Sequence, residues 1–303
     1  MSPKVDEPEA GSLIATIRSH RRTRLYVKPL WWIGMHLRVL GCEYVERGPP
    51  LQEWTQRPEL KITADGCAVI IVPRETDEVT SDLGDALSGA RSATARTSVL
   101  GDFLAASFTP PRDTPLALYY NGTPINIATH GAFVFDSAIP PLTFIDLQGL
   151  RSIRRHYLRR KWVQTPSSPQ HIPTPVTEKN GPILGIINKR LRQLQPVIEL
   201  EDPYIVAILI ALAQKQCHEG HEAGLTTHPG NYDTQGPFKV HLLALSASQT
   251  LCVYKAHFPH SFLEKFNNPS KFSPSGPVSI SYHQLPHLDP KGLRDELYRS
   301  LHN

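Results

Sequence analysis

Alternating apolar and polar residues in the first half of the chain predict two β-hairpins. In residues 60–72, Asp65-Gly66 supplies the two positive-φ residues of a type I′ turn between two alternating runs. In residues 116–128, Asn121-Gly122 likewise forms the predicted turn between two such runs. Pairing Tyr120 with Thr123 puts four apolar residues on one face. These four are Leu116, Leu118, Ile125 and Ile127. With a further strand over 132–135, we expect residues 1–163 to form a strand-rich α+β region that ends in a basic helix.

The patterns between these elements are weaker. Residues 28–45 are hydrophobic, but their periodicity does not decide between helix and strand. An acidic stretch, 75–85, precedes the small-residue tract 88–98, where we expect a mobile loop. Residues 164–181 contain four prolines and almost no large apolar residue, so they predict a linker between two domains. The alternative is a long surface loop inside one domain.

Residues 182–303 predict an α+β unit in the order helix, strand, strand, helix, strand, helix. A one-sided apolar stripe over 183–194 predicts the end of one helix before Pro196. Asp202 and Pro203 predict the start of a second, because an aspartate accepts free backbone N–H groups and proline lacks a donor. That helix is apolar nearly all round and should end near Gly220. A last helix should begin at Asp289-Pro290.

Composition narrows the class of protein. The chain has 303 residues, a formal net charge of +4 and 28 prolines, about twice the usual ~5% share. Its four cysteines form no CxxC pair, so neither a disulfide scaffold nor a zinc ribbon is indicated. The first ten residues lack the features of a secretion signal, and the longest apolar run has ten residues, well short of the ~20 that span a bilayer. We therefore expect a soluble cytoplasmic or nuclear protein.

Familiar catalytic signatures are absent from the sequence. It contains no phosphate-binding P-loop, no GxGxxG motif, no GxSxG nucleophile elbow and no kinase motif. In CHEGHE, residues 217–222, the two histidines are three residues apart, whereas HExxH requires four. The alternatives are a loop-borne metal site that includes His228, or Lys215 and His218 complementing a helix C-terminus. We predict no catalytic residue, no metal ligand and no cofactor.

A second polar cluster lies on the predicted strands over 238–245 and 250–258. An even-length turn centred on Ala247-Ser248 would place His241 on one face and Lys255 with His257 on the other. The order of elements around Lys255 resembles the PD-(D/E)xK nuclease core, a resemblance that implies two metal-binding acids and a charge-stabilising lysine. Val253 occupies one acid position here. An enzyme or degenerate nuclease centred on this unit, with Glu201 and Lys255 as test residues, is the alternative to a binding protein.

The strongest functional signal is a run of positive charge in residues 151–161, which contain no acid. If residues 147–162 form a helix, Arg151, Arg155 and Arg159 project together at i, i+4 and i+8. The predicted anion-binding residues are Arg151, Arg154, Arg155, Arg159, Arg160 and Lys161. We expect a non-catalytic protein that binds nucleic acid or an acidic protein through this helix. The alternatives are a helix-dipole effect, or neutralisation by the acidic segment 75–85 of the same chain.

Several stretches of the last third resemble recurring segments of uncharacterised proteins of filamentous fungi. They are Asp202-Pro203-Tyr204, Ala211–Gln214, Lys239–Leu243, Phe262-Leu263 with Lys265-Phe266, and Ile280-Ser281-Tyr282. The resemblance covers about residues 196–303. It implies an intracellular fungal protein and leaves open an accessory role beside a set of biosynthetic genes, but it carries no activity, cofactor or catalytic residue.

Overall fold

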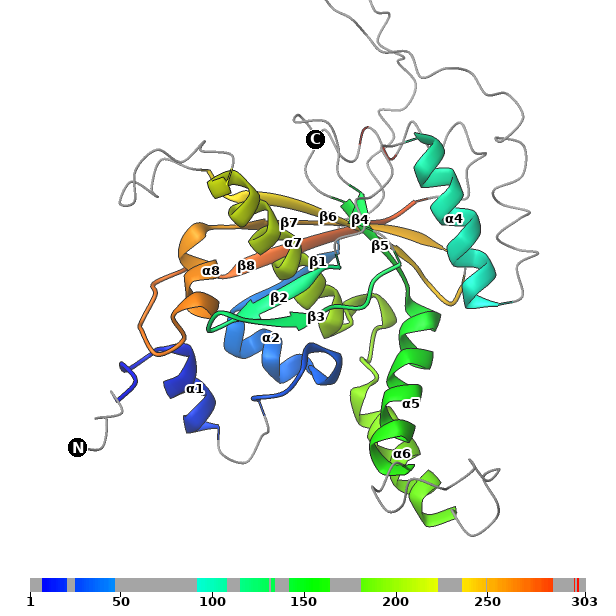
Figure 1. Cartoon of the computed structure of the whole chain (residues 1–303), viewed down its shortest axis with the longest axis horizontal. Helices are drawn as coiled ribbons and strands as arrows, with labels where there is room; N and C mark the ends of the chain where they lie inside the picture. The colour runs from blue at the N-terminus through cyan, green and yellow to red at the C-terminus, as the bar shows by residue number, and fades with distance from the viewer. Residues whose placement is uncertain are drawn as a thin grey trace, which may run out of the picture.

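The protein has an α+β fold built on one mixed sheet and a separate hairpin (Figure 1). The computed structural model describes residues 7–20, 25–46, 92–107, 115–130, 132–133, 142–163, 181–222, 236–248 and 250–285, with Leu297 and Arg299. The six strands of the sheet are, in spatial order, β1 (Cys42–Glu46), β8 (Val278–Gln284), β7 (Leu251–Phe258), β6 (Phe238–Leu245), β5 (Leu142–Asp146) and β4 (Ala132–Phe133). The pairs β1/β8 and β5/β6 are parallel, and the other neighbours are antiparallel.

Seven α-helices and two short 3₁₀-helices surround these strands in the described ranges. The α-helices are α1 (Leu13–Ser19), α2 (Gly34–Leu40), α4 (Ala93–Ser107), α5 (Leu147–Val163), α6 (Gly181–Leu194), α7 (Pro203–Glu222) and α8 (His260–Asn267). The 3₁₀-helices are η1 (Pro29–Trp31) and η3 (Glu199–Glu201). Within these ranges, none of the helices has the length and apolar character to cross a membrane.

The helix α7 forms the centre of the larger core. It starts at Pro203 as predicted, and the Asp202 carboxylate accepts a hydrogen bond of 2.9 Å from the backbone N–H of Tyr204. Every side chain from Tyr204 to Ala213 is at most 2% exposed. Because residues 204–213 are apolar on all sides, this part of α7 packs both on the sheet and under the β2–β3 hairpin.

The hairpin of β2 (Ala117–Tyr120) and β3 (Thr123–Asn126) confirms the prediction at Asn121-Gly122. Tyr120 pairs with Thr123, and φ is +49° at Asn121 and +71° at Gly122. The hairpin is tied to α7 by the buried side chain of Gln214. Its amide oxygen accepts from the backbone N–H of Tyr119 at 2.8 Å, and its amide nitrogen donates to the carbonyl of Tyr119 at 2.9 Å.

The opposite face of the sheet is covered in part by α4. The prediction of a loop over residues 88–98 is wrong from Ala93 onward, because α4 begins there, within the small-residue tract. Ser92 starts this helix by accepting a hydrogen bond from the N–H of Ala95 at 3.1 Å. Leu100 and Leu104, both fully buried, then pack against the sheet and hold the helix there. Alanine-rich sequence is compatible with a helix once such an anchor exists.

The two halves of the chain contribute to the same sheet. Strands β1, β4 and β5 come from residues before the predicted linker, and β6, β7 and β8 come from residues after it. The strand-rich description of the first half is too simple, because its described residues also form α1, α2, α4 and α5. The hairpin at 60–72, the acidic stretch 75–85 and the linker up to residue 180 lie outside the described residues, as does the last predicted helix apart from Leu297 and Arg299.

Candidate anion-binding surface

The basic helix α5 begins directly at the end of β5. Asp146, the last residue of that strand, accepts hydrogen bonds from the backbone N–H groups of Gln148 and Gly149 at 2.8 and 3.1 Å. The same buried carboxylate pairs with Arg96 of α4 at 3.0 Å. The start of α5 is therefore fixed to the body of the protein, and the helix runs away from the sheet with α6 beside it (Figure 1).

The inner side of α5 carries one of the predicted anion-binding residues. Arg154 is 3% exposed and forms two hydrogen bonds, of 2.6 and 2.8 Å, with the carboxylate of Asp202. Its Nε also donates to the carbonyl of Leu30 at 3.1 Å. Leu150 and Leu158, each 1% exposed, lie on the same side. Arg154 is thus a structural residue, because a partner could reach it only after this buried pair had broken.

The remaining arginines of α5 lie outside. Arg151 is half exposed and forms an ion pair of 3.1 Å with Glu199, so its charge is partly neutralised. Arg155, Arg159 and Arg160 are exposed and form no ion pair with the described residues. Lys161 lies in the last turn of α5, and its side chain is outside the described part of the chain. The predicted projection of Arg155 and Arg159 from one face agrees with this burial pattern.

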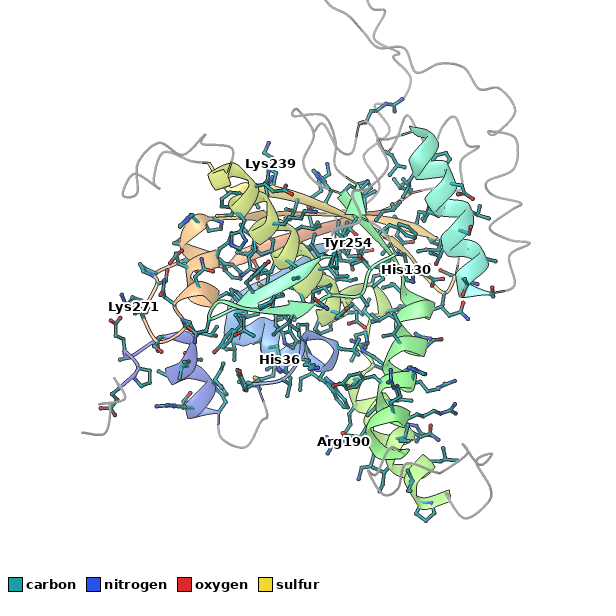
Figure 2. All side chains as sticks on the ribbon, in the orientation of Figure 1. His36, His130, Arg190, Lys239, Tyr254 and Lys271 are labelled. Atoms are coloured by element: carbon teal, nitrogen blue, oxygen red, sulfur yellow. The ribbon has the colours of Figure 1, made fainter. Side chains whose placement is uncertain are left out.

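The neighbouring helix α6 adds positive charge that the sequence analysis did not assign to the site. Lys189, Arg190 and Arg192 are all exposed, and neither α5 nor α6 contains an acidic residue. Figure 2 shows nitrogen-tipped side chains along both helices, with Arg190 labelled on α6. We name these exposed basic side chains of the two adjacent helices the cationic arm: Arg155, Arg159, Arg160, Lys189, Arg190 and Arg192. The absence of acidic residues from 181–194 is a sequence signal that could have indicated the α6 part of the arm.

A second group of basic side chains lies on the sheet. His241 pairs with Lys255 and Lys239 pairs with His257, so all four project from one face. The predicted separation of His241 from Lys255 is wrong by one position of register. Five residues, 246–250, connect the strands where an even-length turn was expected, and the backbone N–H of Ser246 donates to the carbonyl of Thr250 at 3.0 Å. A shift of one residue moves a side chain to the opposite face.

His241 is held neutral in this second group. It is 4% exposed, and burial, followed by the positive charges of Lys255, His257 and Lys239, lowers its pKa to about 3. The Nδ1 atom of its ring has no hydrogen-bond partner in the described part of the chain. These side chains form a cluster separate from the cationic arm.

The residues of the nuclease alternative do not meet. The hydroxyl of Tyr282 donates to Glu201 at 3.3 Å, and Tyr282 stacks on Tyr254 on the α7 side of the sheet. Lys255 follows Tyr254 in β7, so it projects from the other side of the sheet. An acid and a lysine on opposite faces cannot act on one bound phosphate.

Metal ligands do not gather in the described residues. No group of three or more histidine, cysteine, aspartate or glutamate side chains with suitable spacing occurs there. His218 of the CHEGHE segment packs edge-on against the ring of Tyr119, with centroids 4.8 Å apart. Cys42, Cys217 and Cys252 are free and buried. His221 and His228 lie outside the described side chains.

Comparison with known proteins identifies no relative of this chain. No family model, no curated protein and no solved structure matches the chain. The resemblance of residues 196–303 to filamentous-fungal proteins therefore stays a prediction.

Proposed function

We propose that this protein binds nucleic acid through the cationic arm, as a binding protein and not as a catalyst. The observation that carries the proposal is the pairing of two adjacent helices that together contain no acidic residue and expose, among their described side chains, seven arginines and lysines, six of which form the arm. Positive charge gathered on one projecting element attracts polyanions and increases their rate of association.

The chemistry of the arm favours phosphate as the contacted group. Five of its six residues are arginines, and a guanidinium group binds phosphate oxygens through two parallel hydrogen bonds. The α5 half of the arm is also anchored, because Asp146 fixes the start of α5 and the Arg154–Asp202 pair fixes its inner side. A preorganised surface loses less conformational entropy on binding.

The described side chains of α5 and α6 expose little of the apolar surface that a protein partner would bury. Among the described side chains of α5 and α6, Ile186 is the one large hydrophobic residue that is exposed, at 44%. Stable protein interfaces have an apolar or aromatic centre. We therefore favour nucleic acid over an acidic protein, and we expect binding through the phosphates with little dependence on base sequence.

Charge reversal tests the proposal. We expect the wild-type protein to bind a fluorescently labelled 20-base-pair DNA or 20-nucleotide RNA, measured by anisotropy, with an affinity that falls steeply with salt. The double variant Arg155→Glu/Arg159→Glu should bind at least tenfold more weakly. For the DNA, the slope of log K against log salt should become shallower by about 1.8, which is the effect of losing two phosphate contacts. The matched control is Arg38→Glu/Lys271→Glu, which changes the net charge equally at exposed positions outside the arm.

Three results would contradict the proposal. The first is no salt-dependent binding of either nucleic acid by the wild-type protein. The second is an equal loss of binding in the arm variant and the control variant, which would indicate a general charge effect. The third is binding of poly-glutamate but not of nucleic acid, which would identify an acidic protein as the partner class.

A further inference from the structure

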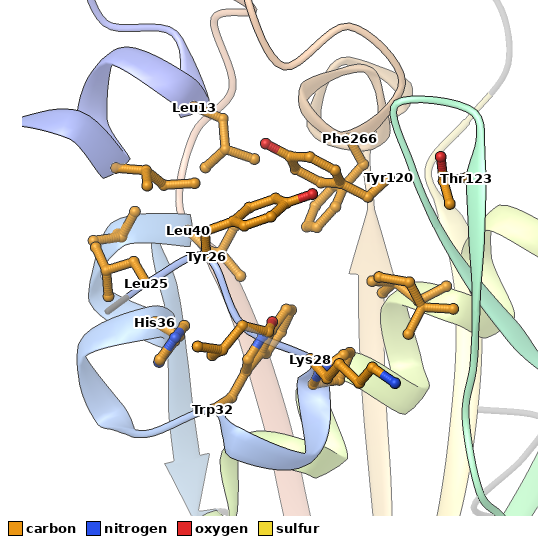
Figure 3. A pocket seen from close by; sticks show the side chains of 16 residues that line it. Leu13, Leu25, Tyr26, Lys28, Trp32, His36, Leu40, Tyr120, Thr123 and Phe266 are labelled. Atoms are coloured by element: carbon orange, nitrogen blue, oxygen red, sulfur yellow. The ribbon is translucent and has the colours of Figure 1, made fainter. Parts of the chain in front are cut away.

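A cavity of about 380 Å³ lies between the β2–β3 hairpin, α8, α1 and the segment that contains η1 and α2 (Figure 3). Its walls are mainly apolar and include Leu13, Trp32, Leu40, Leu118, Ile125 and Phe266. Pockets for small organic ligands have volumes of roughly 300–1,000 Å³, mainly apolar walls and a few fixed polar groups. Size and lining together therefore suit a small organic molecule.

One polar group of the cavity wall is fixed and lacks a partner. His36 is 5% exposed, and its Nδ1 lies 2.9 Å from the backbone nitrogen of Ile33. Because an amide N–H can only donate, Nδ1 accepts this hydrogen bond, and a neutral ring must then carry its proton on Nε2. Nε2 is buried and makes no hydrogen bond of ordinary geometry in the described part of the chain, although the backbone carbonyl of Leu25 lies near the ring.

The imidazole stays neutral in this environment. Burial lowers the pKa of His36, and the nearby backbone carbonyls of Ile33 and Leu25 oppose this to a smaller extent. The ring stacks on Trp32, with 9° between their planes and 5.8 Å between their centroids, so its orientation is fixed (Figure 3). A buried N–H without a partner is unfavourable, and an acceptor on a ligand would satisfy it.

We propose that this cavity binds a small, mainly apolar, uncharged molecule that carries a hydrogen-bond acceptor such as a ketone, and that His36 Nε2–H donates to that acceptor. An uncharged ligand fits better than a carboxylate. The one ammonium group at the cavity wall, on Lys28, lies over the ring of Tyr157 on α5, 5.6 Å from its centroid. Burying a carboxylate among apolar side chains without a close cation is costly. This inference does not rest on the proposed binding of nucleic acid.

The entrance has an aromatic border. The ring of Tyr26 is 74% exposed and meets the ring of Tyr120 edge-on, with centroids 5.6 Å apart. Thr123, at the start of β3, lines the cavity and is itself exposed. Larger side chains can therefore be introduced at the rim without disturbing the core.

Titration with a neutral naphthyl ketone dye, 6-propionyl-2-(dimethylamino)naphthalene, tests whether the cavity binds such a ligand. The full chain should bind one equivalent, saturably, with a blue shift of the emission. Thr123→Trp and Ile125→Trp place an indole at the rim and within the cavity, and each should weaken binding at least tenfold. Asn126→Trp is the matched control, because Asn126 lies on the same strand, is exposed and is not part of the cavity wall. Absence of saturable binding, or equal binding by all three variants, would overturn the proposal.

The role of His36 needs a separate comparison. In His36→Asn the amide oxygen can replace Nδ1 as the acceptor for Ile33, but the side chain ends before the position of Nε2. This variant should bind the ketone dye about three- to tenfold more weakly, the usual effect of one lost hydrogen bond. It should bind the analogue with propyl in place of propionyl as tightly as the wild-type protein does. An equal effect on both dyes, or on neither, would contradict the donation from Nε2.

Discussion

Arg154 and Asp202 form a buried ion pair with two hydrogen bonds, of 2.6 and 2.8 Å, between α5 and the start of α7. Asp202 at the same time caps α7 through the N–H of Tyr204, and Arg154 binds the carbonyl of Leu30. The pair therefore joins the basic helix, the central helix and the segment before α2. It also divides the charges of α5 into one that maintains the fold and others that remain exposed.

Replacement of Arg154 should be far more damaging than replacement of its neighbour. Arg154→Ala leaves the Asp202 carboxylate buried without its cation, so we expect the free energy of unfolding to fall by about 3–5 kcal/mol. Arg155→Ala removes an exposed charge and should change it by no more than about 0.5 kcal/mol. Urea unfolding followed by circular dichroism measures both. Equal losses in the two variants would show that the pair does not hold α5 to α7.

His241 should make the fold sensitive to acid. Its pKa is about 3 in the folded protein against 6.5 in the unfolded chain, so the unfolded state binds more protons between these values. Stability should accordingly fall as the pH falls below 6.5, at up to ~1.4 kcal/mol per pH unit. His241→Gln does not titrate, so between pH 7 and pH 5 it should lose about 2 kcal/mol less than the wild-type protein. Parallel stability curves for the two proteins would contradict this.

Two glycines should respond in opposite directions to alanine. Gly122 has φ of +71° in the hairpin turn, where an alanine is strained, so Gly122→Ala should cost about 1 kcal/mol. Gly185 lies on the exposed face of α6, where a Cβ meets no atom within 4 Å, so Gly185→Ala should stabilise by roughly 0.5–1 kcal/mol. Chemical unfolding of both variants checks the signs, and changes of the same sign would contradict the local explanation.

Features that depend on neighbouring residues could be predicted from the sequence. The Asn121-Gly122 hairpin and the start of α7 at Asp202-Pro203 follow from backbone preferences that act over two or three residues. The basic stretch of α5 is likewise visible because an acid-free run of arginines needs no tertiary information.

Features that depend on strand register or on packing between distant segments could not be predicted from the sequence. One residue in the 246–250 connection decides whether His241 and Lys255 share a face, and turn composition does not fix that number. The start of α4 in a tract expected to be a loop depends on the burial of Leu100 and Leu104 against a sheet formed elsewhere in the sequence. His36 acquires its unpartnered donor only because separate elements close around it.

The sequence alone therefore determined the local turns, the helix caps and the amount of positive charge near residue 155. The tertiary structure decided which of these charges are buried and which are exposed. It buried Arg154 against a carboxylate 48 positions away and placed α6 beside α5 to extend the exposed basic surface. The physical reason is that caps and turns are set by short-range sterics and hydrogen bonds. The burial of a charge depends instead on where distant chain segments meet.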